Sequence, residues 1–331
     1  MDILINKSGQ PVNTQEKFAK RREEIKEYLA ENIYGRLPER PEHLRGETVT
    51  KDTTFAAGDA VLREFSLTLT VKGGEFKMPL RSVAPSGDGK YPAFIYVDYN
   101  SDIPSKHLPA EEIIDRGYAL FCLSSNDICG YGDDFKSGIS KFIAPTRRRK
   151  DSPGKIALLA WAILRVLEFA VTLPYIDADN IAVIGHGTLA RAALVAGGYD
   201  ERIKYVILNN LEFGEGYLSR PYLFGKSFWE NSDGTADNLA LALCAPRHIM
   251  VGAAIDDCAA DNQKGLENLI SLNETYSLFG KSDFTSECDS TDEPITLRSS
   301  SIFYRLRRGP AYLSRKDWNA YIDYINDVKS R

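Results

Sequence analysis

One stretch decides the fold of this chain: Ile181-Ala-Val-Ile-Gly-His-Gly-Thr-Leu-Ala-Arg-Ala-Ala-Leu-Val-Ala-Gly-Gly198. Its first four residues are all apolar, which predicts a buried strand. The Gly185-His186-Gly187 segment predicts a sharp turn, because glycine adopts backbone conformations that other residues avoid. Residues 189–196 are small or apolar apart from Arg191 and predict a helix. The stretch therefore predicts a strand, a tight turn and a helix in direct succession.

This layout resembles the nucleophile elbow of α/β-hydrolases, whose pattern is Gly-x-Ser-x-Gly. In that elbow the serine lies on the turn between strand and helix. Gly187 stands at the serine position of this chain. The stretch thus predicts the fold of a hydrolase but lacks its nucleophile.

The composition indicates a globular protein and argues against several classes of partner. The chain has 331 residues, of which 43% are hydrophobic, enough for one large α/β domain or two smaller ones. Its formal net charge of -5 argues against nucleic acid or an anionic membrane, since both need a basic face. No long apolar run predicts a transmembrane helix, and the N-terminus lacks the pattern of a signal peptide. We therefore expect a cytoplasmic location.

The cysteines and histidines give no sign of a metal site or a cofactor. The five cysteines are scattered, with no Cys-x-x-Cys spacing, so reduced thiols are expected rather than zinc ligands or disulfides. The four histidines show neither His-x-His nor His-Glu-x-x-His spacing. No glycine-rich nucleotide motif follows a strand. We expect no cofactor and no metal.

Strands and helices alternate along the rest of the chain. An amphipathic helix is predicted over residues 15–33, and an antiparallel hairpin over residues 61–80, with Gly73-Gly74 at its turn. Further strands are predicted at 91–98, 118–123, 203–208, 247–252 and 302–306, and helices at 109–116, 156–173, 239–244, 263–279 and 317–328. This alternation predicts an α/β fold with a mostly parallel central sheet flanked by helices. We expect an N-terminal helical extension, residues 1–46, and one compact hydrolase domain, residues 47–331.

Several segments, in this order, resemble the carbohydrate-esterase α/β-hydrolases around glucuronoyl esterases and acetyl xylan esterases. They are Arg21-Arg-Glu-Glu-Ile25, Tyr34-Gly-Arg-Leu-Pro38, the elbow, Ala245-Pro-Arg247 and Arg308-Gly-Pro-Ala-Tyr-Leu-Ser-Arg-Lys-Asp-Trp318. The resemblance covers about residues 15–328 and implies the α/β-hydrolase fold.

The resemblance also implies where the catalytic groups should lie. In that family a serine attacks the ester, the next arginine helps to hold the oxyanion, and an acid orients a late histidine base. The serine position falls on Gly187, the arginine position on Thr188 and the histidine position on Ala311. Glycine cannot form an acyl-enzyme, and alanine cannot accept a proton. The candidates for the remaining acid are Asp256 or Asp257, and Glu212 or Glu215.

These substitutions have two explanations. They were engineered to trap a substrate, or they arose naturally as catalysis was lost. Further departures at Thr188, Ala190 and Arg191 favour natural loss, because an engineer would leave those positions unchanged. Glycine also relieves the strained backbone that the elbow imposes on a residue with a Cβ.

Other side chains are candidates for ligand contact. His186 precedes Gly187, and His107 lies in the loop after strand 91–98, which in α/β-hydrolases faces the oxyanion region. Ordinary packing or solvent exposure is the alternative for both. An aromatic segment is a candidate floor for a sugar-binding cleft, with core packing as its alternative: Tyr217, Tyr222, Phe224, Phe228 and Trp229.

We therefore expect a carbohydrate-esterase-like α/β-hydrolase that has lost serine-hydrolase catalysis and keeps a cleft for a small-molecule or carbohydrate ligand. Two alternatives stay open: an active carboxylic ester hydrolase with a non-standard site, and a non-catalytic scaffold that binds a partner. A short contact from His186 or His107 to a carboxylate or hydroxyl would favour the first alternative, and a packed cleft the second. The expected site consists of the catalytic positions Gly187, Ala311, Asp256 and Glu212 and the ligand contacts His186, Thr188, His107 and Trp229.

Overall fold

A ten-stranded sheet runs through the computed structural model, which describes residues 2–130, 132–143, 149–213, 220–226, 228, 236–286 and 291–330. The strands are β1 His43–Asp52, β2 Ala60–Val71, β3 Gly74–Pro85, β4 Tyr91–Asp98, β5 Ala119–Ser124, β6 Ile176–His186, β7 Ile203–Asn209, β8 His248–Ala254, β9 Ile295–Arg298 and β10 Ile302–Arg307. Their spatial order is β1-β2-β3-β5-β4-β6-β7-β8-β10-β9.

The centre of this sheet is parallel and both of its edges are antiparallel. Strands β5, β4, β6, β7, β8 and β10 run parallel to one another. β1, β2 and β3 add an antiparallel meander at one edge, and β9 pairs antiparallel with β10 at the other. The carboxyl ends of the parallel strands therefore meet along one side of the sheet, where an α/β fold places its functional loops.

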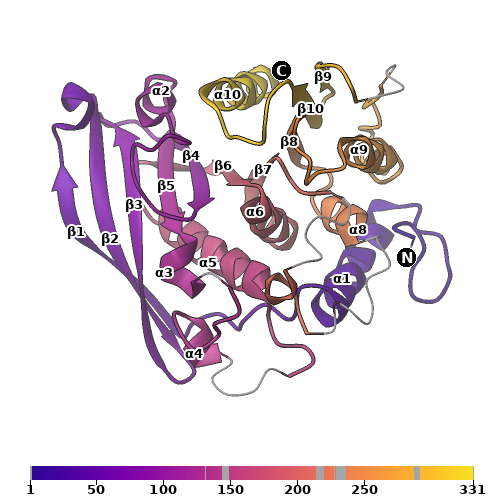
Figure 1. Cartoon of the computed structure of the whole chain (residues 1–331), viewed down its shortest axis with the longest axis horizontal. Coiled ribbons are helices and arrows are strands. Elements are labelled where there is room, and N and C mark those ends of the chain that lie inside the picture. Colours follow the sequence, from indigo (N-terminus) through magenta and orange to yellow (C-terminus); the bar gives the residue numbers. More distant parts are fainter. Residues whose placement is uncertain are drawn as a thin grey trace.

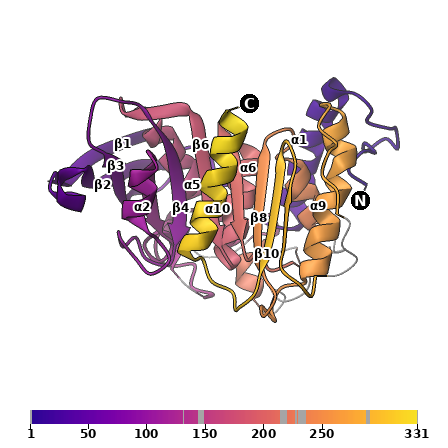
Figure 2. The same cartoon turned by 90° about the horizontal axis from the view of Figure 1, so that it is seen from above.

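Helices cover both faces of the sheet (Figure 1). They are α1 Gln15–Asn32, α2 Ala110–Asp115, α3 Ser125–Cys129, α4 Ser140–Ile143, α5 Lys155–Ala170, α6 Thr188–Tyr199, α8 Ala236–Ala242, α9 Asn262–Ser277 and α10 Arg315–Lys329. Apolar side chains of α1, α5, α6, α8 and α9 form the larger core on one face. Those of α2 and α10 form a smaller core on the other, and Figure 2 shows α10 lying across the strands between β4 and β8.

The structure confirms the predicted fold class, with a mostly parallel central sheet between layers of helices. The predicted N-terminal helix is α1, and the predicted hairpin is β2 and β3. The sequence pattern predicts neither β1 nor β9, the two edge strands. Most β1 side chains are exposed and β9 spans only four residues, so burial imposes little hydrophobic alternation on either strand. No helix in the described parts of the chain is long and apolar enough to span a membrane.

Candidate functional site

The elbow keeps its backbone geometry without its serine. Gly187 lies between β6 and α6 with φ 56° and ψ -129°, and its N–H donates to the Asn209 carbonyl over 2.9 Å. This conformation is strained for residues with a Cβ but not for glycine. A Cβ built on Gly187 would meet no described atom within 4 Å. Open space therefore lies where a nucleophile would point.

Gly185 is required for a different reason. A Cβ on Gly185 would lie 2.5 Å from the Leu189 carbonyl oxygen and 2.8 Å from the Ala190 nitrogen. Both atoms belong to the first turns of α6, so only glycine lets this helix approach β6 so closely. Gly185 thus allows α6 to pack closely against β6, and Gly187 allows the turn between them.

His186 is held by an amide. Its Nδ1 lies 2.7 Å from Asn209 Oδ1, and Asn209 Nδ2 donates to the Tyr321 hydroxyl over 2.8 Å. Because the amide oxygen can only accept, Nδ1 carries the proton and Nε2 is left as an acceptor. Burial lowers the pKa of His186, while the Asn209 hydrogen bond opposes that shift. The imidazole is therefore neutral at pH 7.

Two loops bring a second histidine and a tyrosine to the elbow. The ring centroids of His107 and His186 lie 5.8 Å apart, and those of His107 and Tyr312 lie 4.6 Å apart. Trp318 Nε1 donates to the His107 carbonyl over 2.8 Å, and the Tyr312 hydroxyl donates to the Lys106 carbonyl over 2.7 Å. The loop after β4 and the loop before α10 thus contact each other beside Gly187. The sequence pattern does not predict Tyr312 as a site residue, because only the folded loops bring it to His107.

Neither histidine has the partner that a non-standard hydrolase would need. His186 contacts the Asn209 amide, and the Nδ1 of His107 is buried without a hydrogen-bond partner among the described residues. Within the described ranges, no carboxylate or hydroxyl is hydrogen-bonded to either ring. An imidazole without such a contact is neither oriented by an acid nor placed to activate a hydroxyl.

An arginine lies beside the elbow although residue 188 is a threonine. Arg220 Nη1 donates to Thr188 Oγ1 over 2.6 Å, and Arg220 Nη2 forms an ion pair with Glu212. The Arg220 and Glu212 side chains are 25% and 14% exposed, so the pair lines the surface of the elbow region. Sequence reasoning missed Arg220, because its contact with Thr188 crosses 32 positions and leaves no local pattern.

The two candidate acids lie at different places. Glu212 belongs to the elbow side, where its backbone carbonyl also accepts a hydrogen bond from the buried Arg191. Asp256 lies against the loop that carries Ala311: its Oδ2 accepts from the Gly309 N–H over 3.0 Å. Glu212 thus lies near Thr188, because both bind Arg220. Asp256 lies near Ala311, because it binds Gly309, which is two residues before Ala311 in the chain.

Ala311 lies exposed in a loop that two arginines hold in place. Arg307 donates to the carbonyls of Pro310 over 3.1 Å and Tyr312 over 2.5 Å, and its Nε lies 3.2 Å from the buried carboxylate of Asp317. Arg305 pairs with the same carboxylate over 2.6 Å. The hydrogen bonds of Arg307 therefore hold the loop that carries Ala311, the position at which the resemblance implies a histidine.

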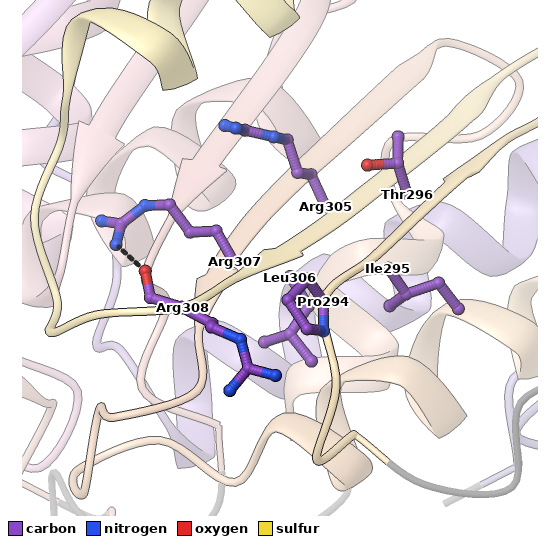
Figure 3. A pocket seen from close by; sticks show the side chains of 7 residues that line it. All are labelled: Pro294, Ile295, Thr296, Arg305, Leu306, Arg307 and Arg308. Carbon is purple, nitrogen blue, oxygen red and sulfur yellow. Dashed lines mark hydrogen bonds between the residues drawn. The ribbon is translucent and has the colours of Figure 1, made fainter.

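These arginines also line a groove of about 370 Å³ between β9 and β10 (Figure 3). Figure 3 shows Arg305 and Arg307 on one side of β10 and Arg308 on the other. Arg308 pairs with Glu293. Because the three guanidinium groups diverge and each has a carboxylate partner, they hold the loop and do not converge on a ligand.

Two described residues of the aromatic segment after β7 pack in the core. Phe224 and Phe228 are each 1% exposed, and their rings stack with centroids 4.1 Å apart. Core packing, the alternative to a sugar-binding floor, therefore applies to these two rings. Trp229, Tyr217 and the candidate acid Glu215 lie outside the described residues.

Comparisons with known proteins agree with the sequence resemblance. No family model matches the chain. A carbohydrate esterase of an unknown prokaryotic organism is 26% identical to it over 65% of this chain and 55% of that protein. The chain spans about half the length of the curated relatives it matches.

Solved structures give the same answer for the fold. The glucuronoyl esterase from Solibacter usitatus matches with a TM-score of 0.84 and 23% identity, over 98% of this chain and 96% of that chain. A variant of the glucuronoyl esterase from Sporotrichum thermophile, in complex with methyl 4-O-methyl-beta-D-glucopyranuronate, matches with a TM-score of 0.71 and 18% identity, over 99% and 87% of the two chains. The chain thus has the α/β-hydrolase fold, and its sequence resembles carbohydrate esterases of the glucuronoyl esterase type.

Proposed function

We propose that this protein binds a carbohydrate carboxylic ester, or the corresponding acid, over Gly187 without hydrolysing it. One observation carries the proposal. A Cβ on Gly187 would meet no described atom within 4 Å, and the Arg220 guanidinium is hydrogen-bonded to the side chain of the next residue, Thr188. The elbow therefore has room and polar groups for a ligand but no nucleophile.

The absence of turnover follows from the residue types. Gly187 has no side-chain atom that can attack a carbonyl, and Ala311 has none that can take a proton. In subtilisin, removing either the nucleophile or the base lowers kcat by about a millionfold. The geometry of His186 supports the same conclusion, because an amide holds its Nδ1 and no carboxylate in the described ranges orients it.

Binding is supported by the donors that remain on Arg220. A guanidinium has five N–H groups, and the two described contacts of Arg220 use one each from Nη1 and Nη2. The others have no acceptor among the described residues and can donate to the oxygens of an ester or a carboxylate. Glu212 keeps the guanidinium in place and offers acceptor positions to sugar hydroxyls.

Isothermal titration with methyl 4-O-methyl-beta-D-glucopyranuronate tests this proposal. We expect saturable binding to the unmodified protein, and a loss of affinity of about 10-fold or more for Arg220→Gln, since a hydrogen bond to a charged group contributes about 1.5–3 kcal/mol. Arg202→Gln is the matched control, because Arg202 also pairs with a carboxylate, that of Asp200, but just before the start of β7, whereas Asn209 beside the elbow is at its end. Absence of binding, or equal affinities for both variants, would contradict the proposal.

A reversion experiment tests the loss of catalysis separately. The double substitution Gly187→Ser with Ala311→His restores the nucleophile and base that the resemblance implies. Ester hydrolysis by this variant, but not by the unmodified protein, would show that two side chains account for the missing activity. Hydrolysis by the unmodified protein would contradict the proposal directly.

The two alternatives have weaker support. An active hydrolase with a non-standard site needs a base that is hydrogen-bonded to a nucleophile, and among the described residues no hydroxyl or thiol is hydrogen-bonded to the ring of His186 or His107. A partner-binding scaffold predicts side chains packed over Gly187, whereas a Cβ on Gly187 would meet no described atom within 4 Å. We keep the cytoplasm as the proposed location, which the free thiols of Cys122, Cys129, Cys244 and Cys258 support.

A further inference from the structure

A chain of hydrogen bonds joins the elbow to two other elements. Asn209, at the end of β7, connects the ring of His186 to the hydroxyl of Tyr321 on α10, over 2.7 Å and 2.8 Å. Asn209 and Tyr321 are both buried. The carbonyl of Asn209 also accepts the Gly187 N–H over 2.9 Å. Asn209 therefore holds both residues of the turn, His186 through its side chain and Gly187 through its backbone.

A glycine in the neighbouring strand makes room for these contacts. A Cβ on Gly252 in β8 would lie 1.9 Å from the Tyr321 hydroxyl and 2.9 Å from Asn209 Nδ2. Glycine in the interior of a strand weakens it and often marks the close approach of another group. The contact between Asn209 and Tyr321 therefore requires glycine at position 252.

We propose that His186 determines the specificity of the elbow site: its Nε2 accepts a hydrogen bond from a hydroxyl of the bound ligand, and Asn209 is the positioning residue that keeps this nitrogen unprotonated. The inference rests on the proposed function, because it needs a ligand over Gly187. It adds the group that the site recognises on that ligand, a hydroxyl donor near the ester or acid, and it makes binding dependent on pH.

The first support is the state of the second ring nitrogen. Because Nδ1 donates its proton to the Asn209 amide oxygen, Nε2 carries a lone pair. Among the described residues Nε2 has no hydrogen-bond partner, yet it is not one of the buried polar atoms that lack a partner. The His186 side chain is only half-buried. Its Nε2 is therefore an acceptor that solvent or a ligand can reach.

The second support is the direction in which this nitrogen points. The two nitrogens of an imidazole point away from each other, so Nε2 is directed away from Asn209. On the ring itself lies His107, with the two ring planes 25° apart, and no hydrogen bond between the rings is present in the described structure. A Cβ on the next residue, Gly187, would meet no described atom within 4 Å. A ligand over Gly187 therefore lies one residue from this acceptor.

The third support is the protonation state of the ring. Burial lowers the pKa of His186, and His107 acts in the same direction. The Asn209 hydrogen bond opposes that shift, as do the carboxylates of Asp98 at the end of β4 and Asp257 in the loop after β8. The ring is neutral at pH 7, and protonation at lower pH turns Nε2 from an acceptor into a donor. A ligand hydroxyl thus loses its acceptor at acid pH.

His186 and Arg220 then offer a ligand complementary groups. Arg220, bound to Thr188, has N–H donors for an ester or carboxylate oxygen. His186 has the acceptor for a hydroxyl. The two side chains together select a hydroxy acid or its ester over an ester that carries no hydroxyl.

Isothermal titration with methyl 4-O-methyl-beta-D-glucopyranuronate between pH 5 and pH 8 tests the inference, because this ester carries hydroxyls and no group that titrates in that range. We expect a constant affinity near pH 8 and a progressive loss as the pH falls below the pKa of His186. His186→Phe keeps a ring without an acceptor. It should weaken binding about fivefold at pH 7.5, the effect of one hydrogen bond, and abolish the pH dependence. His43→Phe, at an exposed histidine in β1, is the matched control.

Asn209→Asp tests the positioning role with a side chain of the same shape. A carboxylate next to Nδ1 stabilises the protonated ring, so the pH at which affinity falls should rise by about one unit or more. If Asn209 only supports the fold, that pH will stay the same. Unfolding midpoints equal to that of the unmodified protein show that the variants are folded.

The 2-deoxy and 3-deoxy analogues of the ester identify the hydroxyl. One of them should bind the unmodified protein about as weakly as the parent ester binds His186→Phe, and should lose no further affinity in that variant. Full affinity of both analogues for the unmodified protein overturns the inference.

Nitrogen-15 NMR of the unmodified protein gives a readout that needs no variant. We expect His186 to be protonated on Nδ1 alone, and its Nε2 resonance to move upfield when the ester is added. A ring protonated on Nε2 at pH 7 overturns the inference.

The outcomes separate this inference from the proposed function. Ester binding that leaves the Nε2 resonance unmoved and does not depend on pH overturns the inference and leaves the proposed function standing. Hydrolysis of the ester by the unmodified protein, with an affinity that still follows His186, does the reverse. Absence of binding at every pH overturns both.

Discussion

Replacing Gly187 by serine should cost stability through backbone strain alone. With φ 56° and ψ -129°, the residue lies outside the left-handed region that other residues occupy. A residue with a Cβ held in such a conformation costs about 1–3 kcal/mol. A Cβ would meet no described atom within 4 Å, so packing adds no penalty. Because serine also restricts the unfolded chain, which offsets about 0.4–1 kcal/mol, we expect the free energy of unfolding to fall by up to about 2.6 kcal/mol.

Urea unfolding followed by tryptophan fluorescence measures this change, and Gly185→Ser is the matched control. The Cβ of that variant would lie 2.5 Å from the Leu189 carbonyl oxygen, so α6 must move away from β6. Overpacking of this kind costs about 3 kcal/mol or more at a site closed by backbone. We therefore expect a much larger loss for Gly185→Ser. Equal losses, or a gain in stability for Gly187→Ser, would refute the assigned elbow conformation.

Two further predictions concern stability. Arg307→Gln removes one of two cations from buried Asp317 and three hydrogen bonds to carbonyls of the Ala311 loop; we expect about 1–3 kcal/mol lower stability and faster proteolysis between residues 308 and 314, and an unchanged cleavage rate would contradict this role. Burial, with the charges of Lys281 and Lys204, lowers the pKa of His248 to about 4. The unfolded histidine titrates near pH 6.5, so its contribution is full above pH 6.5 and is lost as the pH falls towards 4. His248→Phe, which keeps a ring beside Tyr205, should flatten the pH dependence of stability in that window; an unchanged slope would count against the assignment.

The sequence predicts the central elements of this fold because burial leaves a strong pattern. Strand β4 has the predicted bounds, and α6 follows β6 after one turn. The two edge strands escape prediction because most β1 side chains face solvent and β9 is only four residues long. Hydrophobic periodicity therefore predicts the buried strands of the sheet but not the two strands at its edges.

The candidate site is less predictable, because its contacts join residues far apart in the chain. The resemblance predicts Gly187 and Ala311 as site positions through their neighbours in the motif. It cannot place Arg220 on Thr188, because the two residues lie 32 positions apart in the chain. Sequence position also cannot predict the hydrogen-bond partners of the two candidate acids. Glu212 binds Arg220, and Asp256 binds the Gly309 N–H in the loop before α10.

The most direct test of the account is the hydrolysis of methyl 4-O-methyl-beta-D-glucopyranuronate by the purified, unmodified protein under conditions in which calorimetry detects binding. The account predicts saturable binding with no release of methanol above the uncatalysed rate. Methanol release that disappears when His186 or His107 is replaced by alanine would contradict it, because it would show that this elbow still carries out ester chemistry.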